Sequence, residues 1–176
     1  MRLVAGANVS LQKIQGKLQD AGALETIAHY LELLEEAFLV AALPKYSIRP
    51  ARRRSTPPKL VTLSNAFLAV VDPSGIPAQG PDLSRFGAWV ENASLAHAWN
   101  AGQRVTYWRE EPLEVDGVID GGWGRWAIEV KTAAISSAEL GGLVEFVRRH
   151  REYRPLVLCD RKELRAVERM GVDAMS

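Results

Sequence analysis

Cysteine and histidine are scarce in this sequence. Its 176 residues include one cysteine, Cys159, within "RPLVLCD". Because a single cysteine has no partner in the chain, the sequence excludes a disulfide framework and a cysteine zinc site. We interpret Cys159 as a small buried residue of a strand. The histidines have neither a ligand nor a nucleophile near them in sequence, so we interpret them as structural; they are His29, His97 and His150.

Long apolar runs and an excess of one charge are also missing. No run approaches the about 18 apolar residues of a membrane-spanning helix, and the first residues lack the apolar core of a signal peptide. We therefore expect a cytoplasmic protein without a membrane partner. The net charge of +1 is ordinary for a globular protein. A phosphate loop, G-x-x-x-x-G-K-S/T, is missing too, because Gly16-Lys17 is followed by Leu18, and we expect no ATPase site in this chain.

Basic residues are concentrated in one segment, "KYSIRPARRRSTPPK" at 45–59, which contains no acidic residue. Such a segment can neutralise the phosphates of a nucleic acid, but it is equally typical of a solvated loop, and both interpretations stay open. Its three prolines predict a linker or an extended edge, because proline fits neither a helix interior nor a central strand. The basic residues are Lys45, Arg49, Arg52, Arg53, Arg54 and Lys59.

The first part of the chain has a helical pattern. "SLQKIQGKL" is followed by a short break and then by "TIAHYLELLEEAFLVAAL" at 26–43, which predicts a helix ended by Pro44. Two helices joined by a short turn are the outline of a helix-turn-helix. The acidic second helix, with Glu32, Glu35 and Glu36, favours a packing arm over a DNA reader. We predict a helical, helix-turn-helix-like segment at 1–45 and a second domain at 46–176.

The second domain has the pattern of an α/β protein. A helix is predicted from about Leu83 to Ala101, with Glu91 next to its apolar stripe. Strands are predicted at 104–110, 114–120 and 125–131, a helix at 136–153 beginning with a Ser136–Glu139 capping box, a strand at 154–159 and a helix at 161–171. A helix between two strands usually makes them parallel, so we expect a mixed sheet with helices packed against it.

Charged residues are unexpectedly frequent in the hairpin "LEVDGVIDGGWGRWAIEVKT" at 113–132. Alternation along a strand places Glu114 and Asp116 on one face, opposite Val115 and Gly117, and it places Glu129 and Lys131 together on the next strand. Asp116 and Glu129 face the same way only if the turn around "DGGWG" contains an even number of residues.

Two such carboxylates would lie a few ångströms apart and raise each other's pKa unless a cation lies between them. Mg²⁺ and Mn²⁺ prefer oxygen ligands of this kind, whereas zinc would require histidine or cysteine, which this hairpin lacks. Lys131 could orient a water molecule or stabilise a phosphoryl oxygen. The pattern suggests metal-assisted phosphodiester hydrolysis. The alternative is a solvated strand face on which Lys131 forms ordinary ion pairs.

The hairpin and the helix before it resemble the PD-(D/E)XK nuclease superfamily. The shared features are a helix that carries a glutamate, an aspartate near a strand end, a turn, and Glu-x-Lys on the next strand. More narrowly, five blocks in order look like the domain of unknown function found C-terminal to AAA-type ATPases of bacteria and archaea. The resemblance implies a restriction-endonuclease-like core of helix, three-strand meander, helix and strand with a mixed sheet. The blocks are "YLELLEEAFLVAALPKYS", "PPKL", "GAWVENASLAHAW", "YWREEPLEVDGVID" and "WAIEVKTA".

The resemblance also implies roles for individual residues. It assigns catalysis to Asp116, Glu129, Lys131 and Glu91, and a Mg²⁺ or Mn²⁺ ion to Asp116, Glu129 and Glu114. Its implied partners are a nucleic acid and an AAA-type ATPase in cis or in trans. The alternative is a catalytically inactive module with the same fold that binds nucleic acid or protein. The residues expected to contact nucleic acid are Arg49, Arg52, Arg53, Arg54 and Lys59.

Overall fold

The computed structural model describes residues 24–48, 56–72, 74–77 and 83–176. The first predicted helix, "SLQKIQGKL", lies outside these ranges. Four of the five residues expected to contact nucleic acid also lie outside them, namely Arg49, Arg52, Arg53 and Arg54. Lys59, the fifth, is described.

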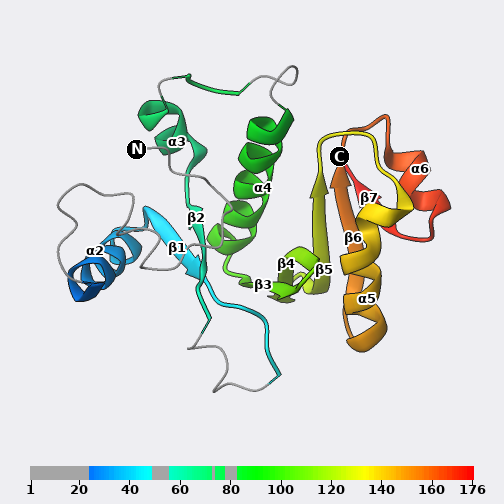
Figure 1. Ribbon diagram of the computed structural model, residues 1–176, viewed down its shortest axis with the longest axis horizontal. Helices are drawn as coiled ribbons and strands as arrows, with labels where there is room; N and C mark the ends of the chain where they lie inside the picture. Colours follow the sequence, from blue (N-terminus) through cyan, green and yellow to red (C-terminus); the bar gives the residue numbers. More distant parts are fainter. Residues whose placement is uncertain (1–23, 49–55, 73, 78–82) are drawn as a thin grey trace.

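A five-stranded sheet forms the centre of the protein (Figure 1). The first three strands form an antiparallel meander, and the last two run parallel to the third. The prediction of an α/β fold with a mixed sheet is therefore confirmed. In spatial order the strands are β3 (Arg104–Glu110), β4 (Leu113–Gly121), β5 (Gly124–Lys131), β6 (Arg154–Cys159) and β7 (Asp173–Met175).

Helices cover both faces of this sheet (Figure 1). On one face lies α4 (Leu83–Asn100), and on the other lie α5 (Gly141–Arg149) and α6 (Leu164–Arg169). The helix predicted at 136–153 is shorter and begins with the 3₁₀ helix η2 (Ser137–Leu140). Glu139 accepts a hydrogen bond from the Ser136 backbone N–H at 2.8 Å, as the capping box predicts. No helix in the described ranges has the length and apolar character needed to cross a membrane.

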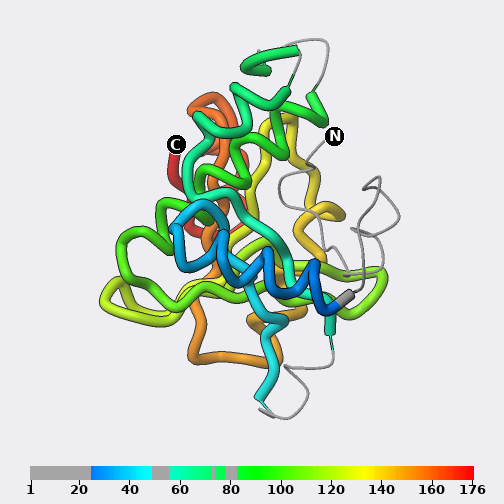
Figure 2. The backbone as a smooth tube through the Cα atoms, turned by 90° about the vertical axis from the view of Figure 1, so that its left-hand side faces the viewer, coloured from blue at the N-terminus to red at the C-terminus, as the bar shows by residue number. Residues whose placement is uncertain are grey.

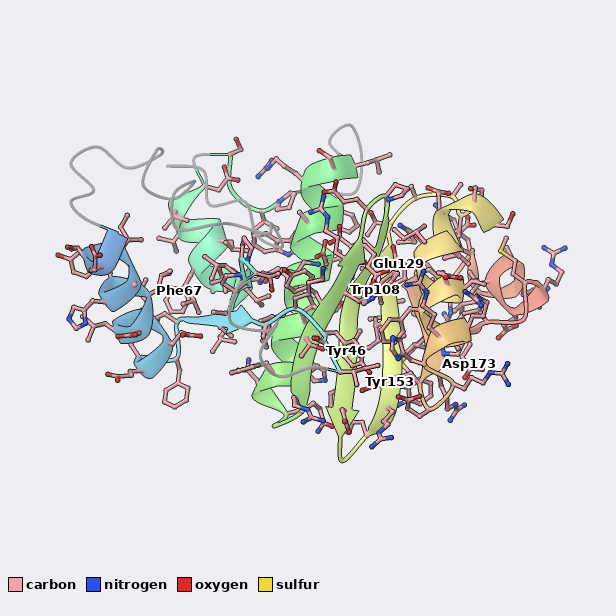
Figure 3. All side chains as sticks on the ribbon, turned by 60° about the horizontal axis from the view of Figure 1, so that its bottom comes forward. Tyr46, Phe67, Trp108, Glu129, Tyr153 and Asp173 are labelled. Atoms are coloured by element: carbon pink, nitrogen blue, oxygen red, sulfur yellow. The ribbon has the colours of Figure 1, made fainter. Side chains whose placement is uncertain are left out.

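Each face of the sheet has its own hydrophobic core. Ala127 belongs to the core under α5, and its neighbour Ile128 belongs to the core under α4, because successive strand residues point to opposite faces. At one end of the α5 core, Tyr46 packs edge-to-face on Tyr153 with the ring centroids 5.7 Å apart (Figure 3). Phe146 of α5, which is fully buried, contacts both tyrosine rings.

The chain before α4 forms a second, smaller unit packed on the α4 side, in which strand β1 pairs with strand β2. Figure 2 shows that α2 lies outermost, in front of this strand pair. The boundary expected at residue 45 falls between the two paired strands. The elements are α2 (Leu24–Glu36), β1 (Val40–Leu43), β2 (Lys59–Thr62) and α3 (Asn65–Val71).

The helix predicted at 26–43 is wrong beyond Glu36. The chain turns at Phe38, whose φ is 55°, and continues as β1, with Val40 opposite Thr62 of β2. The apolar residues "VAAL" fit both the 3.6-residue period of a helix and the two-residue period of a strand. Pairing with β2 favours the strand, because it buries alternate side chains. Pro44 does not end a helix, because it follows β1, and its carbonyl oxygen accepts a hydrogen bond from Tyr107 of β3.

A β-bulge in β4 changes the expected alternation. Thr106 lies opposite Val118, but Trp108 lies opposite Val115, so that one residue of β3 faces two of β4. Val115 therefore packs in the α5 core, whereas a Cβ on Gly117 would lie 2.6 Å from Leu95 in the α4 core. The expectation that Val115 and Gly117 share a face is wrong for this reason.

Helix α5 touches the backbone of β4 at Gly142. A Cβ at this position would lie 2.0 Å from the Glu114 carbonyl oxygen, whereas a Cβ on Gly141 would be in ordinary contact at 3.8 Å from Leu113. We expect Gly142→Ala to lower the free energy of unfolding by at least about 2 kcal/mol, because the backbones must separate. We expect Gly141→Ala to change it by less than about 1 kcal/mol. Urea denaturation measures both, and equal effects would contradict this packing.

Candidate functional site

The β4–β5 hairpin brings its acidic residues to one end. The turn contains two residues, since Gly121 pairs with Gly124, so the even-number condition is met. At the far end the ladder stops at the pair of Gly117 and Ile128. Asp116 and Glu129 are the next residues, and they lie across from each other where the two strands separate.

The Asp116 carboxylate occupies the gap between these strands. Its Oδ2 accepts a hydrogen bond from the Val130 backbone N–H at 2.9 Å, beyond the last strand-to-strand pair. Its Oδ1 lies 3.7 Å from Lys59 Nζ. Asp116 belongs to the bulge of β4, and bulges commonly redirect a side chain in this way.

Lys59, the first residue of β2, lies inside a group of carboxylates. Its side chain is 1% exposed, and Nζ lies 2.5 Å from Glu91 Oε1 and 3.7 Å from Glu114 Oε1. Nζ also donates a hydrogen bond to the Asp116 carbonyl oxygen at 3.3 Å. A side chain this buried cannot contact a phosphate at the surface, so Lys59 does not have the position expected of a nucleic-acid contact. We call Lys59, Glu91, Glu114 and Asp116 the Lys59 cluster.

Glu91 reaches the cluster from α4. Burial, followed by the negative charge of Asp116, raises the pKa of Glu91 to about 7 against the opposing effect of Lys59. The next residue, Asn92, fixes α4 to β2: its Oδ1 accepts from the Thr62 N–H at 2.9 Å, and its Nδ2 donates to the Thr62 carbonyl at 2.8 Å. Sequence reasoning missed Asn92, because its complete burial inside the helix is visible only in the structure. Buried polar side chains almost always have a hydrogen-bond partner.

Glu129 and Lys131 form a second group on β5, which we call the Glu129 pair. Lys131 Nζ lies 2.8 Å from Glu129 Oε1. The other oxygen, Oε2, is buried and has no hydrogen-bond partner in the described part of the chain, and the side chain is 9% exposed. Burial, followed by the negative charge of Asp116, raises the pKa of Glu129 to about 8 against the opposing effect of Lys131.

The two groups approach Asp116 from opposite faces of the sheet. Ile128 and Val130 pack in the α4 core, so alternation places Glu129 on the α5 side, where Figure 3 shows it beside β5. Lys59 and Glu91 come from β2 and α4, on the other side. Asp116 therefore connects the Lys59 cluster to the Glu129 pair.

The donor set fits a divalent metal only in part. Across the described residues, no group of three or more histidine, cysteine, aspartate or glutamate side chains could hold an ion. The expected three-carboxylate set is therefore not assembled. Glu114 forms ion pairs with Lys59 and with Arg109, whose Nε is 3.7 Å from Glu114 Oε2. Asp116 and Glu129 do fit, since Mg²⁺ is often held by one or two carboxylates plus water, and Glu129 Oε2 lacks a hydrogen-bond partner among the described residues.

Comparisons with known proteins give a family but no activity. The family described as "Domain of unknown function (DUF4143)" matches residues 86–175, a range that includes Glu91, Asp116 and Glu129 but not Lys59. No curated protein matches the sequence. Among solved structures, the crystal structure of protein VC1899 from Vibrio cholerae matches with 12% identity and a TM-score of 0.35, over 96% of this chain and 41% of that one. The chain thus spans less than half of that protein, and a TM-score this low supports no statement about the fold.

The raised pKa of Glu129 predicts a pH-dependent stability in metal-free buffer. Between the ordinary carboxylate pKa and about 8, the folded protein binds more protons than the unfolded chain, so the free energy of unfolding falls as pH rises through this window. Glu129→Gln resembles the protonated form. We expect it to stabilise the protein relative to wild type by more than about 1 kcal/mol at pH 8.5, and by less at pH 4.5.

Urea denaturation at the two pH values, with a chelator present, measures this difference. Glu168→Gln, on the exposed surface of α6, is the matched control and should show no such pH-dependent gain. A Glu129→Gln variant that is equally destabilised at both pH values would show that Glu129 is ionised and well compensated in the folded protein.

Proposed function

The chain belongs to the family described as "Domain of unknown function (DUF4143)", and from its site we propose that it is a divalent-metal-dependent phosphodiester hydrolase acting on nucleic acid. The observation that carries this proposal is the buried Oε2 of Glu129, which has no hydrogen-bond partner among the described residues. Glu129 lies across from Asp116 at the open end of the β4–β5 hairpin. The order α4, β3, β4, β5, α5, β6 supports a PD-(D/E)XK nuclease-like core.

The charges at the hairpin favour a cation. A buried carboxylate oxygen without a partner destabilises the folded state by about 1–3 kcal/mol, and the nearby charge of Asp116 adds repulsion. Lys131 pairs with one oxygen of Glu129, and the other oxygen has no hydrogen-bond partner among the described residues. A Mg²⁺ or Mn²⁺ ion held by Asp116 and Glu129 would satisfy that oxygen and reduce the repulsion.

The residues of the chain then have distinct roles. When bound, the metal supplies a Lewis acid and lowers the pKa of a coordinated water. Lys131, whose side chain is partly exposed, provides a positive charge to stabilise a phosphoryl oxygen as its negative charge grows. Glu91 acts on the site through Lys59, so it is a positioning residue.

Two further parts of the proposal concern partners. Arg49, Arg52, Arg53 and Arg54 are proposed to hold the phosphate backbone, because phosphate contacts from arginine position a nucleic acid without reading its sequence. An AAA-type ATPase, in cis or in trans, is the proposed protein partner, on the resemblance of the sequence blocks.

A second candidate function is an inactive module that binds nucleic acid or protein. The observation in its favour is Lys59, which already neutralises part of the acidic charge from a position that is 1% exposed. In that case the Lys59 cluster and the Glu129 pair are an ion-pair network that stabilises the fold, and no metal is needed.

Calorimetric titration with Mn²⁺ distinguishes the two functions. We expect saturable binding to the wild type and a loss of at least about tenfold in affinity in Asp116→Asn, which keeps the shape of the side chain but removes its charge. Asp173→Asn, on the exposed edge strand β7, is the control and should bind like the wild type. Binding should be accompanied by Mn²⁺-dependent cleavage of DNA or RNA, single- or double-stranded. No binding at millimolar Mn²⁺ would favour the inactive module.

Lys131→Met separates metal binding from chemistry. Because Lys131 is proposed to stabilise the reacting phosphoryl group, its loss should reduce the cleavage rate by about 10²-fold or more while Mn²⁺ still binds. Lys162→Met removes an exposed lysine from the loop before α6 and should leave cleavage unchanged. Unaltered cleavage by Lys131→Met would exclude this role.

A further inference from the structure

Lys59 is one of two charged side chains that are buried in the described part of the chain, and the other is Glu129. Its ammonium group contacts carboxylates from two different elements, Glu91 of α4 and Glu114 and Asp116 of β4. Three carboxylates around one ammonium leave an excess of negative charge. The ammonium group is thus the positive charge that compensates these carboxylates.

The backbone of β2 holds Lys59 in this position from both sides. Before it, the Tyr107 hydroxyl donates a hydrogen bond to the Pro57 carbonyl at 2.6 Å, beside the bulge of β4. After it, Asn92 bonds both backbone groups of Thr62. The hydrogen bonds on both sides of Lys59 therefore fix the position of β2, and this position directs the Lys59 side chain toward the carboxylates.

We propose that Lys59 is an internal cation that competes with the divalent metal for Asp116 and so sets the metal affinity of the site. The proposal rests on the proposed function, because it concerns the same carboxylate. Asp116 Oδ1 lies 3.7 Å from Lys59 Nζ, and Oδ2 is bonded to the Val130 N–H. A metal that takes an oxygen of Asp116 must lie near the ammonium group, and two cations so close repel strongly in a buried, low-dielectric site.

The competition has two consequences. In the metal-free protein, Lys59 compensates Glu91, Glu114 and Asp116, so the fold does not depend on metal. In the metal-bound protein, Lys59 either moves away from Asp116 or weakens metal binding by electrostatic repulsion. Removing its positive charge should therefore increase metal affinity and make the fold depend on metal.

The test compares Mn²⁺ affinity by calorimetry, and Mn²⁺-dependent melting temperature, in two variants. Lys59→Met removes the charge at nearly constant shape. Because it leaves three carboxylates uncompensated and can fail to fold without metal, Lys59→Met/Glu91→Gln removes one negative charge as well. We expect each folded variant to bind Mn²⁺ at least about tenfold more tightly than wild type and to show a larger rise in melting temperature. Lys162→Met, which removes an exposed lysine, should match the wild type.

The outcomes separate this inference from the proposed function. If the wild type binds Mn²⁺ through Asp116 and the Lys59 variants bind equally or more weakly, the competition is overturned and the proposed function stands. If only the Lys59 variants bind, the competition is supported, and the wild-type chain is not a metal-dependent enzyme. If neither the wild type nor the variants bind, both proposals are overturned.

Discussion

A lysine ammonium that has been removed from water must be surrounded by acceptors, and the rest of the site depends on this requirement at Lys59. Its partners come from α4 and β4, so the β1–β2 pair is fixed against the α4 face of the main sheet. A buried pair of this kind adds little net stability compared with apolar packing, but removing one partner is strongly destabilising. The cluster therefore specifies how the smaller unit meets the sheet more than it stabilises the fold.

The same requirement concentrates negative charge where β4 and β5 separate. Asp116, one of the carboxylates that compensate Lys59, also acts on Glu129, and burial together with the charge of Asp116 raises the pKa of Glu129 to about 8. Lys131 compensates only part of that charge, because the second oxygen of Glu129 has no hydrogen-bond partner in the part of the chain that the structure describes. The Lys59 cluster on the α4 side and the Glu129 pair on the α5 side thus both interact with the carboxylate of Asp116. Because of this shared carboxylate, a structural ion-pair network and a metal site are alternatives at the same place. A fold can also be kept when its activity is absent.

The sequence predicted the parts of the fold that local patterns determine. Strands β3 to β6 and helix α4 follow from periodicity. The position of Asp116 across from Glu129 depended on an even number of residues in the turn, a condition that the sequence left open and that the pairing of Gly121 with Gly124 meets. Long-range pairing determined the rest. Residues 40–43 continue a helical pattern but form β1 because β2 is available to pair with them. Lys59 looks like the end of a basic segment, and its burial depends on acids from α4 and β4 that no local pattern connects to it.

The most direct test of the central claim is anomalous diffraction from crystals of the protein grown with Mn²⁺. We predict one strong peak at coordination distance from carboxylate oxygens of both Asp116 and Glu129, with the Lys59 ammonium farther than 3.7 Å from Asp116 Oδ1. Crystals with no peak at these carboxylates, and with Lys59 still paired to Asp116, would contradict the metal site and leave the cluster as a structural ion-pair network.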